Sequence, residues 1–146
     1  MAKPSNEEVV RRYVDAHAAH DHDTLGALRD PDWTLEWPQS GERVRGDAND
    51  RAIMSNWPVD QPSGLTLRVV GSEDQWFVTP FNTIHRLNGS GDFWFADGTS
   101  AYPDGSTWFV VALIQLRDGK VWRETWYFGA PFEAPAWRAA WVERMS

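Results

Sequence analysis

The sequence predicts an α+β fold in which a bent antiparallel sheet wraps around N-terminal helices. Helical periodicity is concentrated in the first 57 residues, whereas strand-like alternation dominates the last third of the chain. Two turn signals, Pro103-Asp104-Gly105 and Asp118-Gly119, separate β-branched and aromatic runs there, which is typical of consecutive hairpins. Segregated helices and strands indicate the α+β class. A length of 146 residues fits one domain, residues 1–146.

The first helix is predicted from a capping box, Ser5 with Glu8, followed by one broad face at 3.6-residue spacing. That face contains Val9, Val10, Tyr13, Val14, His17 and Ala18, and the helix should end near residues 20–21. Asp23 is the expected N-cap of a short second helix over 24–28, which Asp30-Pro31 would terminate.

The remaining elements follow from alternation and turn chemistry. A strand is expected over 33–37, a short return strand over 43–46, and a helix over 48–57 that ends before Pro58. A strand over 65–70 precedes an irregular stretch, and the meander then occupies 83–87, 93–102, 107–117 and 120–128. A short amphipathic helix over 136–144, with Trp137 and Trp141 on one side, ends the chain.

Composition excludes several classes of function. A net charge of −7 argues against nucleic acid and against anionic membrane surfaces as partners. The chain contains no cysteine, so it has no disulfide or thiolate zinc site, and no apolar run approaches the roughly 20 residues of a membrane span. The N-terminus lacks the apolar core of a signal peptide, so we expect a cytoplasmic protein.

The layout resembles the SnoaL-like group of the nuclear transport factor two-like superfamily. The resemblance covers nearly the whole chain and is carried by the order and spacing of several segments: residues 9–14, His20-Asp21-His22-Asp23, Leu35-Glu36-Trp37-Pro38 with Arg45-Gly46, and Asp118-Gly119-Lys120-Val121 leading to Trp126-Tyr127-Phe128. It implies a conical cavity between the helices and the concave sheet face, and frequent dimers. Its enzymes include ketosteroid isomerases, polyketide cyclases, dehydratases and epoxide hydrolases, and it also includes many non-enzymes.

Carried over by residue, the resemblance matches Tyr13 with the tyrosine that donates the oxyanion hydrogen bond in ketosteroid isomerases. The general-base aspartate of those enzymes falls on Trp37, and their protonated aspartate falls near residues 111–113, which cannot donate. The last-strand aspartate of epoxide hydrolases and some cyclases falls on Trp126. Steroid isomerisation by the family mechanism is therefore not expected.

Strand parity predicts the cavity face. A two-residue turn at Asp118-Gly119 would place Glu124 opposite Leu113 and Trp126 opposite Val111. A bulged turn at residues 103–105 would pair Tyr102 with Ser106 and point Asp97 inward, whereas a two-residue turn would point Trp94, Ala96, Gly98 and Ser100 inward. The predicted pocket lining is Trp37, Phe109, Val111, Leu113, Trp122, Trp126 and Phe128.

The candidate catalytic groups are Tyr13, His17, Asp97 and Glu124. Tyr13 and His17 lie one helical turn apart, and histidine is the natural proton shuttle near neutral pH. A carboxylate among tryptophans is expected to have a raised pKa, which a protonated His17 would oppose, and this suits general acid–base work.

Three functions are consistent with these sequence features. The first is a small cofactor-free enzyme acting on an apolar cyclic or aromatic molecule, the second a non-catalytic hydrophobic ligand-binding protein, and the third a structural dimerisation module. His20 and His22 diverge at a helix end, so no metal site is expected. Both faces of the last two strands are apolar, so we expect a homodimer.

Overall fold

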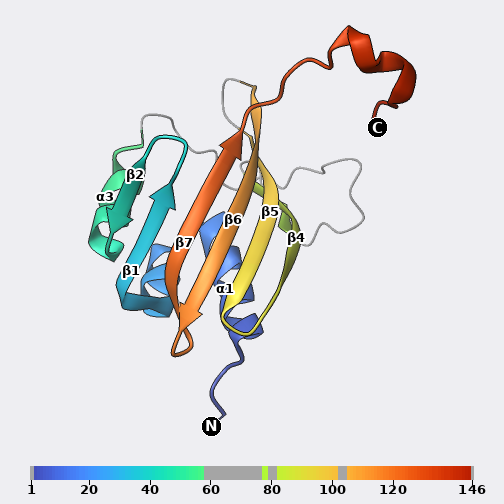
Figure 1. Cartoon of the computed structure of the whole chain (residues 1–146). Coiled ribbons are helices and arrows are strands. Elements are labelled where there is room, and N and C mark those ends of the chain that lie inside the picture. The colour runs from blue at the N-terminus through green and yellow to red at the C-terminus, as the bar shows by residue number, and fades with distance from the viewer. Residues whose placement is uncertain (1, 58–76, 79–81, 102–104, 146) are drawn as a thin grey trace.

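The computed structural model describes residues 2–57, 77–78, 82–101 and 105–145. One mixed sheet carries three helices on one face, and no helix of the described residues lies on the other face (Figure 1). Its strand order is β2-β1-β7-β6-β5-β4-β3. The elements are α1 (Asn6–Ala18), α2 (His22–Leu28), β1 (Arg29–Trp37), β2 (Glu42–Arg45), α3 (Asp47–Ser55), β3 (Phe77–Val78), β4 (Asn82–Ser90), β5 (Phe93–Ala101), β6 (Thr107–Arg117), β7 (Lys120–Gly129) and a 3₁₀ turn, η1 (Ala136–Trp141). The α+β prediction is confirmed. The predicted strand over 65–70 lies outside the described residues.

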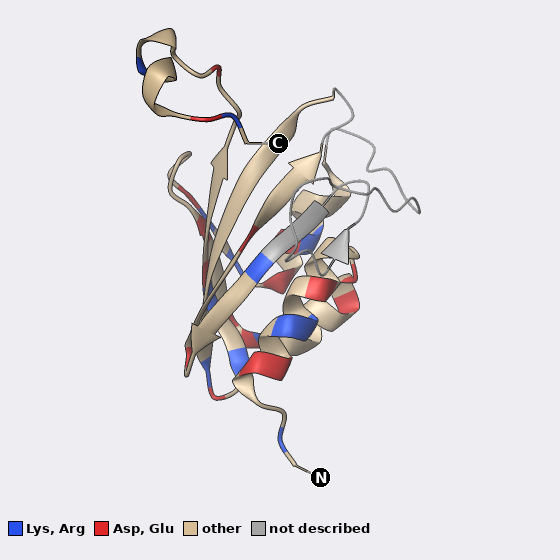
Figure 2. Cartoon of the chain, turned by 90° about the vertical axis from the view of Figure 1, so that its right-hand side faces the viewer, with Lys and Arg blue, Asp and Glu red and all other residues tan. Residues whose placement is uncertain are grey.

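Helix α1 begins as the capping box predicts. The Ser5 hydroxyl accepts from the Glu8 amide at 3.2 Å, and the Glu8 carboxylate accepts from the Ser5 amide at 2.7 Å. The helix packs Val9, Val10, Tyr13 and Val14 into the core. Its charged residues, which colour the ribbon in Figure 2, include the exposed Glu7, Arg11, Arg12 and Asp15.

The junction between the first two helices lies earlier than predicted. Helix α1 ends at Ala18, and His20 adopts a left-handed backbone conformation with φ of 56°. Asp21, and not Asp23, caps α2, because its carboxylate accepts from the Thr24 amide at 3.1 Å. The chain then enters β1 directly at Arg29, since extended backbone precedes Pro31.

Strand β1 pairs with β7 in the parallel direction, whereas the sequence suggested an antiparallel sheet. Leu35 lies beside Glu124 and Thr34 beside Arg123, and the β1–β2 hairpin forms the sheet edge next to them. The pairing joins residues about ninety positions apart, so no local turn signal in the sequence predicts it. It brings Arg29, at the start of β1, beside Val121, and the second half of β1 beside the part of β7 that carries Glu124.

The β6–β7 hairpin contains a bulge that reverses the predicted faces of β6. The two-residue turn is present, since Arg117 pairs with Lys120 and Leu116 with Val121, but Gln115 then pairs with Arg123. Trp122 is the extra residue and stacks on the guanidinium groups of Arg117 and Arg123 at 4.7 and 4.0 Å. A bulge of this kind shifts the register by one residue, so that every side chain beyond it points to the opposite face of the sheet from the one predicted.

Glu124 consequently lies opposite Ile114 instead of Leu113. The inward side chains of β6 are Val110, Ala112 and Ile114, and the predicted inward residues Phe109, Val111 and Leu113 lie on the outer face of the sheet.

The predicted inward position of Asp97 on β5 is also affected by the bulge at Trp122. The pairing of Ala101 with Thr107 continues the register predicted from the bulged turn, whose residues 102–104 lie outside the described part of the chain. Because Asp97 pairs with Val111, it shares the outer face with that residue. Trp94, Ala96 and Ser100 are the buried positions of β5, so the prediction that Asp97 points inward is wrong.

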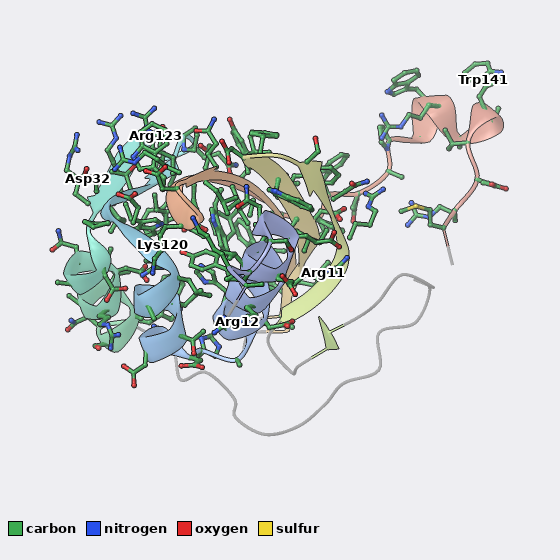
Figure 3. The ribbon with its side chains drawn as sticks, turned by 90° about the horizontal axis from the view of Figure 1, so that it is seen from below. Arg11, Arg12, Asp32, Lys120, Arg123 and Trp141 are labelled. Carbon is green, nitrogen blue, oxygen red and sulfur yellow. The ribbon has the colours of Figure 1, made fainter. Side chains whose placement is uncertain are left out.

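The C-terminal segment leaves the sheet. The predicted helix over 136–144 is instead a short 3₁₀ turn, and Trp137 and Trp141 are 73% and 79% exposed. Figure 3 shows Trp141 well away from the sheet and from Arg11 and Arg12 on α1. Among the described residues, no helix is both long and apolar enough to cross a membrane.

Candidate functional site

A cavity of about 150 Å³ lies between the helices and the inner face of β5, β6 and β7. Most of its wall is apolar, and the polar side chains come mainly from the helical side. Its lining includes Val14, His17, His20 and His22 from the α1–α2 region, Trp37 from β1, Asp50, Met54 and Trp57 from α3 and its end, Ala96 to Ser100 from β5, Val110, Ala112 and Ile114 from β6, and Trp126 and Phe128 from β7.

The predicted site residues divide into three groups. His17, Trp37, Trp126 and Phe128 line the cavity. Tyr13 and Glu124 are fully buried behind its wall. Phe109, Val111, Leu113 and Trp122 lie outside the cavity lining because of the β7 bulge.

Asp97 is one of the β5 residues that border the cavity, but its side chain is on the outer face of the strand, where its carboxylate belongs to a cross-strand ion pair. Arg86 donates to it through Nη2 at 2.6 Å and through Nε at 3.1 Å. The Asp97 carboxylate is therefore already engaged by a guanidinium group on the neighbouring strand.

Glu124 is the centre of a buried polar cluster. It is 1% exposed, and three side chains donate to its carboxylate. The Tyr13 hydroxyl and Trp33 Nε1 reach Oε2 at 2.5 and 2.7 Å, and Trp126 Nε1 reaches Oε1 at 3.1 Å. Helix α1 supplies the first donor, β1 the second and β7 the third, so the carboxylate holds three elements together.

The pKa of Glu124 is lowered, contrary to the expectation for a carboxyl group among tryptophans. Burial has the largest single influence and acts to raise the pKa, but it is outweighed by His17, by the charge of Arg29 and by the Tyr13 hydrogen bond. Burial, together with the Glu124 charge, raises the pKa of Tyr13 well above 10. Near neutral pH, Glu124 is thus an ionised acceptor and Tyr13 a protonated donor.

His17 connects this cluster to the cavity. Its Nε2 lies 3.7 Å from Glu124 Oε1. Its ring packs edge-on against Tyr13 and at a tilt of 55° against Trp126, each with centroids 4.9 Å apart. Nε2 has no hydrogen-bond partner among the described residues. The imidazole therefore combines access to the cavity with a carboxylate partner on its buried side.

Arg29 is the main site residue that sequence reasoning missed. It is 5% exposed, and its Nε donates to the Tyr13 hydroxyl at 2.8 Å. Its Nη1 lies 2.7 Å from Asp47 and 2.9 Å from Asp50, and its guanidinium group lies 3.7 Å from the Trp33 ring centroid. In the sequence, Arg29 lies between the end of the predicted second helix and the start of the alternating strand. No periodic pattern there predicts that its side chain is buried.

His20 and His22 also line the cavity. The pKa of His20 is lowered, first by burial and then by the neighbouring His22 and His17, so its imidazole is neutral near pH 7. In the described part of the chain, no group of three or more histidine, cysteine, aspartate or glutamate side chains has a geometry that could hold a metal ion.

A curved sheet with helices on its concave face and an apolar hollow between them defines the cone-shaped nuclear transport factor two-like class. The chain belongs to the SnoaL-like family within it, because the family's SnoaL-like domain matches residues 10–124. A comparison with functionally curated proteins gave no match.

Several solved structures are similar over most of the chain. An NTF-2 like protein of unknown function from Burkholderia xenovorans LB400 is 32% identical, with 97% of this chain and 95% of that chain covered and a TM-score of 0.73. A putative ketosteroid isomerase from Kribbella flavida DSM 17836 is 23% identical, with 97% and 90% covered and a TM-score of 0.74. An LEH-like epoxide hydrolase from M. tuberculosis is 19% identical, with 84% and 81% covered and a TM-score of 0.58. The last two show the shared fold.

Proposed function

We propose that this protein is a small cofactor-free enzyme that performs general acid–base chemistry on an apolar cyclic molecule, with His17 as the proton carrier. The observation that carries the proposal is the position of His17, which lines the cavity and lies 3.7 Å from the ionised Glu124. Isomerisation, cyclisation, dehydration and epoxide opening all need such a group. Two structural neighbours, described as a putative ketosteroid isomerase and an epoxide hydrolase, bear names within this range of chemistry.

In this proposal Glu124 acts through His17. A buried carboxylate beside an imidazole orients the ring and stabilises the imidazolium that forms when the ring accepts a proton. Tyr13, Trp33 and Trp126 hold the carboxylate in place. Tyr13 is thus a positioning residue and not the oxyanion donor that the resemblance implied, because its hydroxyl already donates to Glu124 and it does not line the cavity.

The elementary step is a proton transfer within the cavity. Neutral His17 takes a proton from a carbon next to a carbonyl group of the ligand, the imidazolium pairs with Glu124, and the proton returns to a different ligand atom.

Replacing His17 by asparagine is expected to lower the rate of this step by about 100-fold or more, the usual contribution of a general base. The measurement is deuterium incorporation from D₂O into a panel of cyclic ketones, followed by NMR. His22→Asn is the matched control, since His22 lines the same cavity but is not paired with Glu124, and it should keep most of the rate. Unchanged exchange in His17→Asn, with the fold verified by circular dichroism, would contradict the proposal.

A non-catalytic ligand-binding protein is the second candidate. It is favoured by the engagement of both predicted carboxylates, Glu124 with three donors and Asp97 with Arg86. This candidate predicts saturable binding of cyclic ligands by the wild-type protein without any deuterium exchange.

We also propose that two copies associate through the outer face of the sheet. Phe93, Phe109, Val111 and Tyr127 are between 39% and 53% exposed on that face, which none of the helices in the described part of the chain covers (Figure 1). The patch is bordered by Arg123 and by the Asp97–Arg86 pair. An apolar centre with a rim of both charge signs suits an isologous dimer, in which one patch meets its own copy.

The double variant Phe109→Glu/Val111→Glu is expected to abolish this association, because it would bury carboxylates at the centre of the patch. Light scattering coupled to size exclusion should give twice the chain mass of 16.7 kDa for the wild type and 16.7 kDa for the variant. Arg12→Glu, on the helical side of the sheet (Figure 3), should leave the dimer intact. A monomeric wild type would contradict this proposal.

A further inference from the structure

Two indole nitrogens at the cavity are hydrogen-bond donors without a partner. Trp37 and Trp57 both line the cavity. The Nε1 atom of each is buried and has no hydrogen-bond partner among the described residues. An indole N–H can only donate, and leaving a buried donor unsatisfied costs about 1–3 kcal/mol. Because buried polar groups in folded proteins are almost always paired, these two nitrogens point to acceptor atoms on a bound molecule.

The size of the cavity limits what that molecule can be. Its volume is about 150 Å³. An engineered apolar cavity of about this size in another protein holds one benzene molecule. The hollow therefore suits a single six-membered ring with a small substituent, and it is too small for a fused polycycle.

The charges behind the wall limit the ligand further. Asp50 lines the cavity and is 3% exposed, and Glu124 lies just behind it. Arg29 is the buried cation that faces both carboxylates, and it also pairs with Asp47. With His17 in the neutral form that acts as the base, Asp50 and Glu124 outnumber Arg29, and Asp47 is offset by Arg51, so an anionic ligand would meet net repulsion in a poorly hydrated space.

We propose that the cavity selects a neutral, single-ring ligand with a carbonyl or ester oxygen, and that Trp37 and Trp57 donate hydrogen bonds to that oxygen. The indole N–H groups bind the ligand oxygen, and the apolar wall packs against the ligand ring. The excess of carboxylates disfavours binding of a carboxylic acid with the same ring. The inference rests on the proposed function only in that it takes the same cavity as the ligand site.

Three probes of equal ring size separate these effects: acetophenone is a neutral ketone, ethylbenzene has no acceptor, and benzoate is an anion. Ligand-observed NMR titration of the wild-type protein should rank their affinities as acetophenone first, ethylbenzene second and benzoate last. Trp37→Phe and Trp57→Phe keep an aromatic ring but remove the N–H, so each should weaken acetophenone by about 3- to 10-fold and leave ethylbenzene unchanged. Trp108→Phe is the matched control, because Trp108 lies outside the cavity lining, and it should change neither affinity.

The inference is overturned if acetophenone does not bind, if ethylbenzene or benzoate binds as tightly as the ketone, or if both cavity variants keep full ketone affinity. Its failure is distinguishable from that of the acid–base proposal. Selective ketone binding without deuterium exchange would remove the catalytic proposal alone. Exchange catalysed with equal binding of ketone and hydrocarbon would remove the selection by Trp37 and Trp57 alone.

Discussion

Replacing Glu124 by glutamine should lower the free energy of unfolding by about 3 kcal/mol or more. The ionised carboxylate accepts from Tyr13, Trp33 and Trp126 inside the core, and a neutral amide presents an oxygen on only one side. At least one buried donor would then face an NH₂ group. Urea unfolding should show the loss with an unchanged slope, and the melting temperature should fall by roughly 10 °C.

The loss should also depend on pH in a defined direction. Because the folded-state pKa of Glu124 is lowered, the carboxylate contributes stability above its unfolded pKa of about 4.3. That contribution disappears as pH falls through the folded-state pKa. The stability difference between wild type and Glu124→Gln should therefore be largest near pH 7 and shrink in acid below pH ~4.

Glu36→Gln is the matched control, because Glu36 lies on the neighbouring strand β1 and its side chain is 42% exposed beside Arg43. Its effect should stay within about 0.5 kcal/mol at any pH. Equal stability of the two variants would show that the buried hydrogen bonds of Glu124 do not hold the helix to the sheet.

Replacing Arg29 by methionine is expected to cost about 3–5 kcal/mol of folding free energy, the usual penalty for breaking a buried ion pair from one side. Asp50 would lose its counterion in a nearly inaccessible position, and the Tyr13 hydroxyl would lose a donor. Asp47 would suffer less, because Arg51 also binds it at 2.8 Å. Chemical denaturation of the purified variant measures this loss.

A second substitution tests the cause. The double variant Arg29→Met/Asp50→Asn also removes the Asp50 carboxylate, which has no counterion in Arg29→Met, and should recover part of the lost stability. Arg43→Met removes an exposed arginine from its pair with Glu36 and should change stability by less than about 1 kcal/mol. A double variant as unstable as Arg29→Met alone would show that lost packing on Trp33, and not the unpaired carboxylate, explains the penalty.

The buried polar cluster around Glu124 was predictable from local sequence patterns only in part. The one-turn spacing of Tyr13 and His17 in a capped helix predicts that they share a face, and they do, with ring centroids 4.9 Å apart. The influence of His17 on the pKa of Glu124 was also expected. Arg29 was not, because a charged residue at a helix–strand junction has no periodic neighbours that reveal its burial.

The sequence by itself determined the α+β class, the family, the first helix and its cap, and the hairpin between β6 and β7, since each depends on contacts between near neighbours in the chain. Tertiary structure alone decided which face of β6 looks inward, because one extra residue at Trp122 shifts the parity of all that follows. It also decided that β1 runs parallel to β7. The β1–β7 pairing joins residues about ninety positions apart, and the bulge, although local, is fixed by which face of β6 packs against the helices. The free energy of both is distributed over many packed side chains and is not encoded in any single turn or spacing.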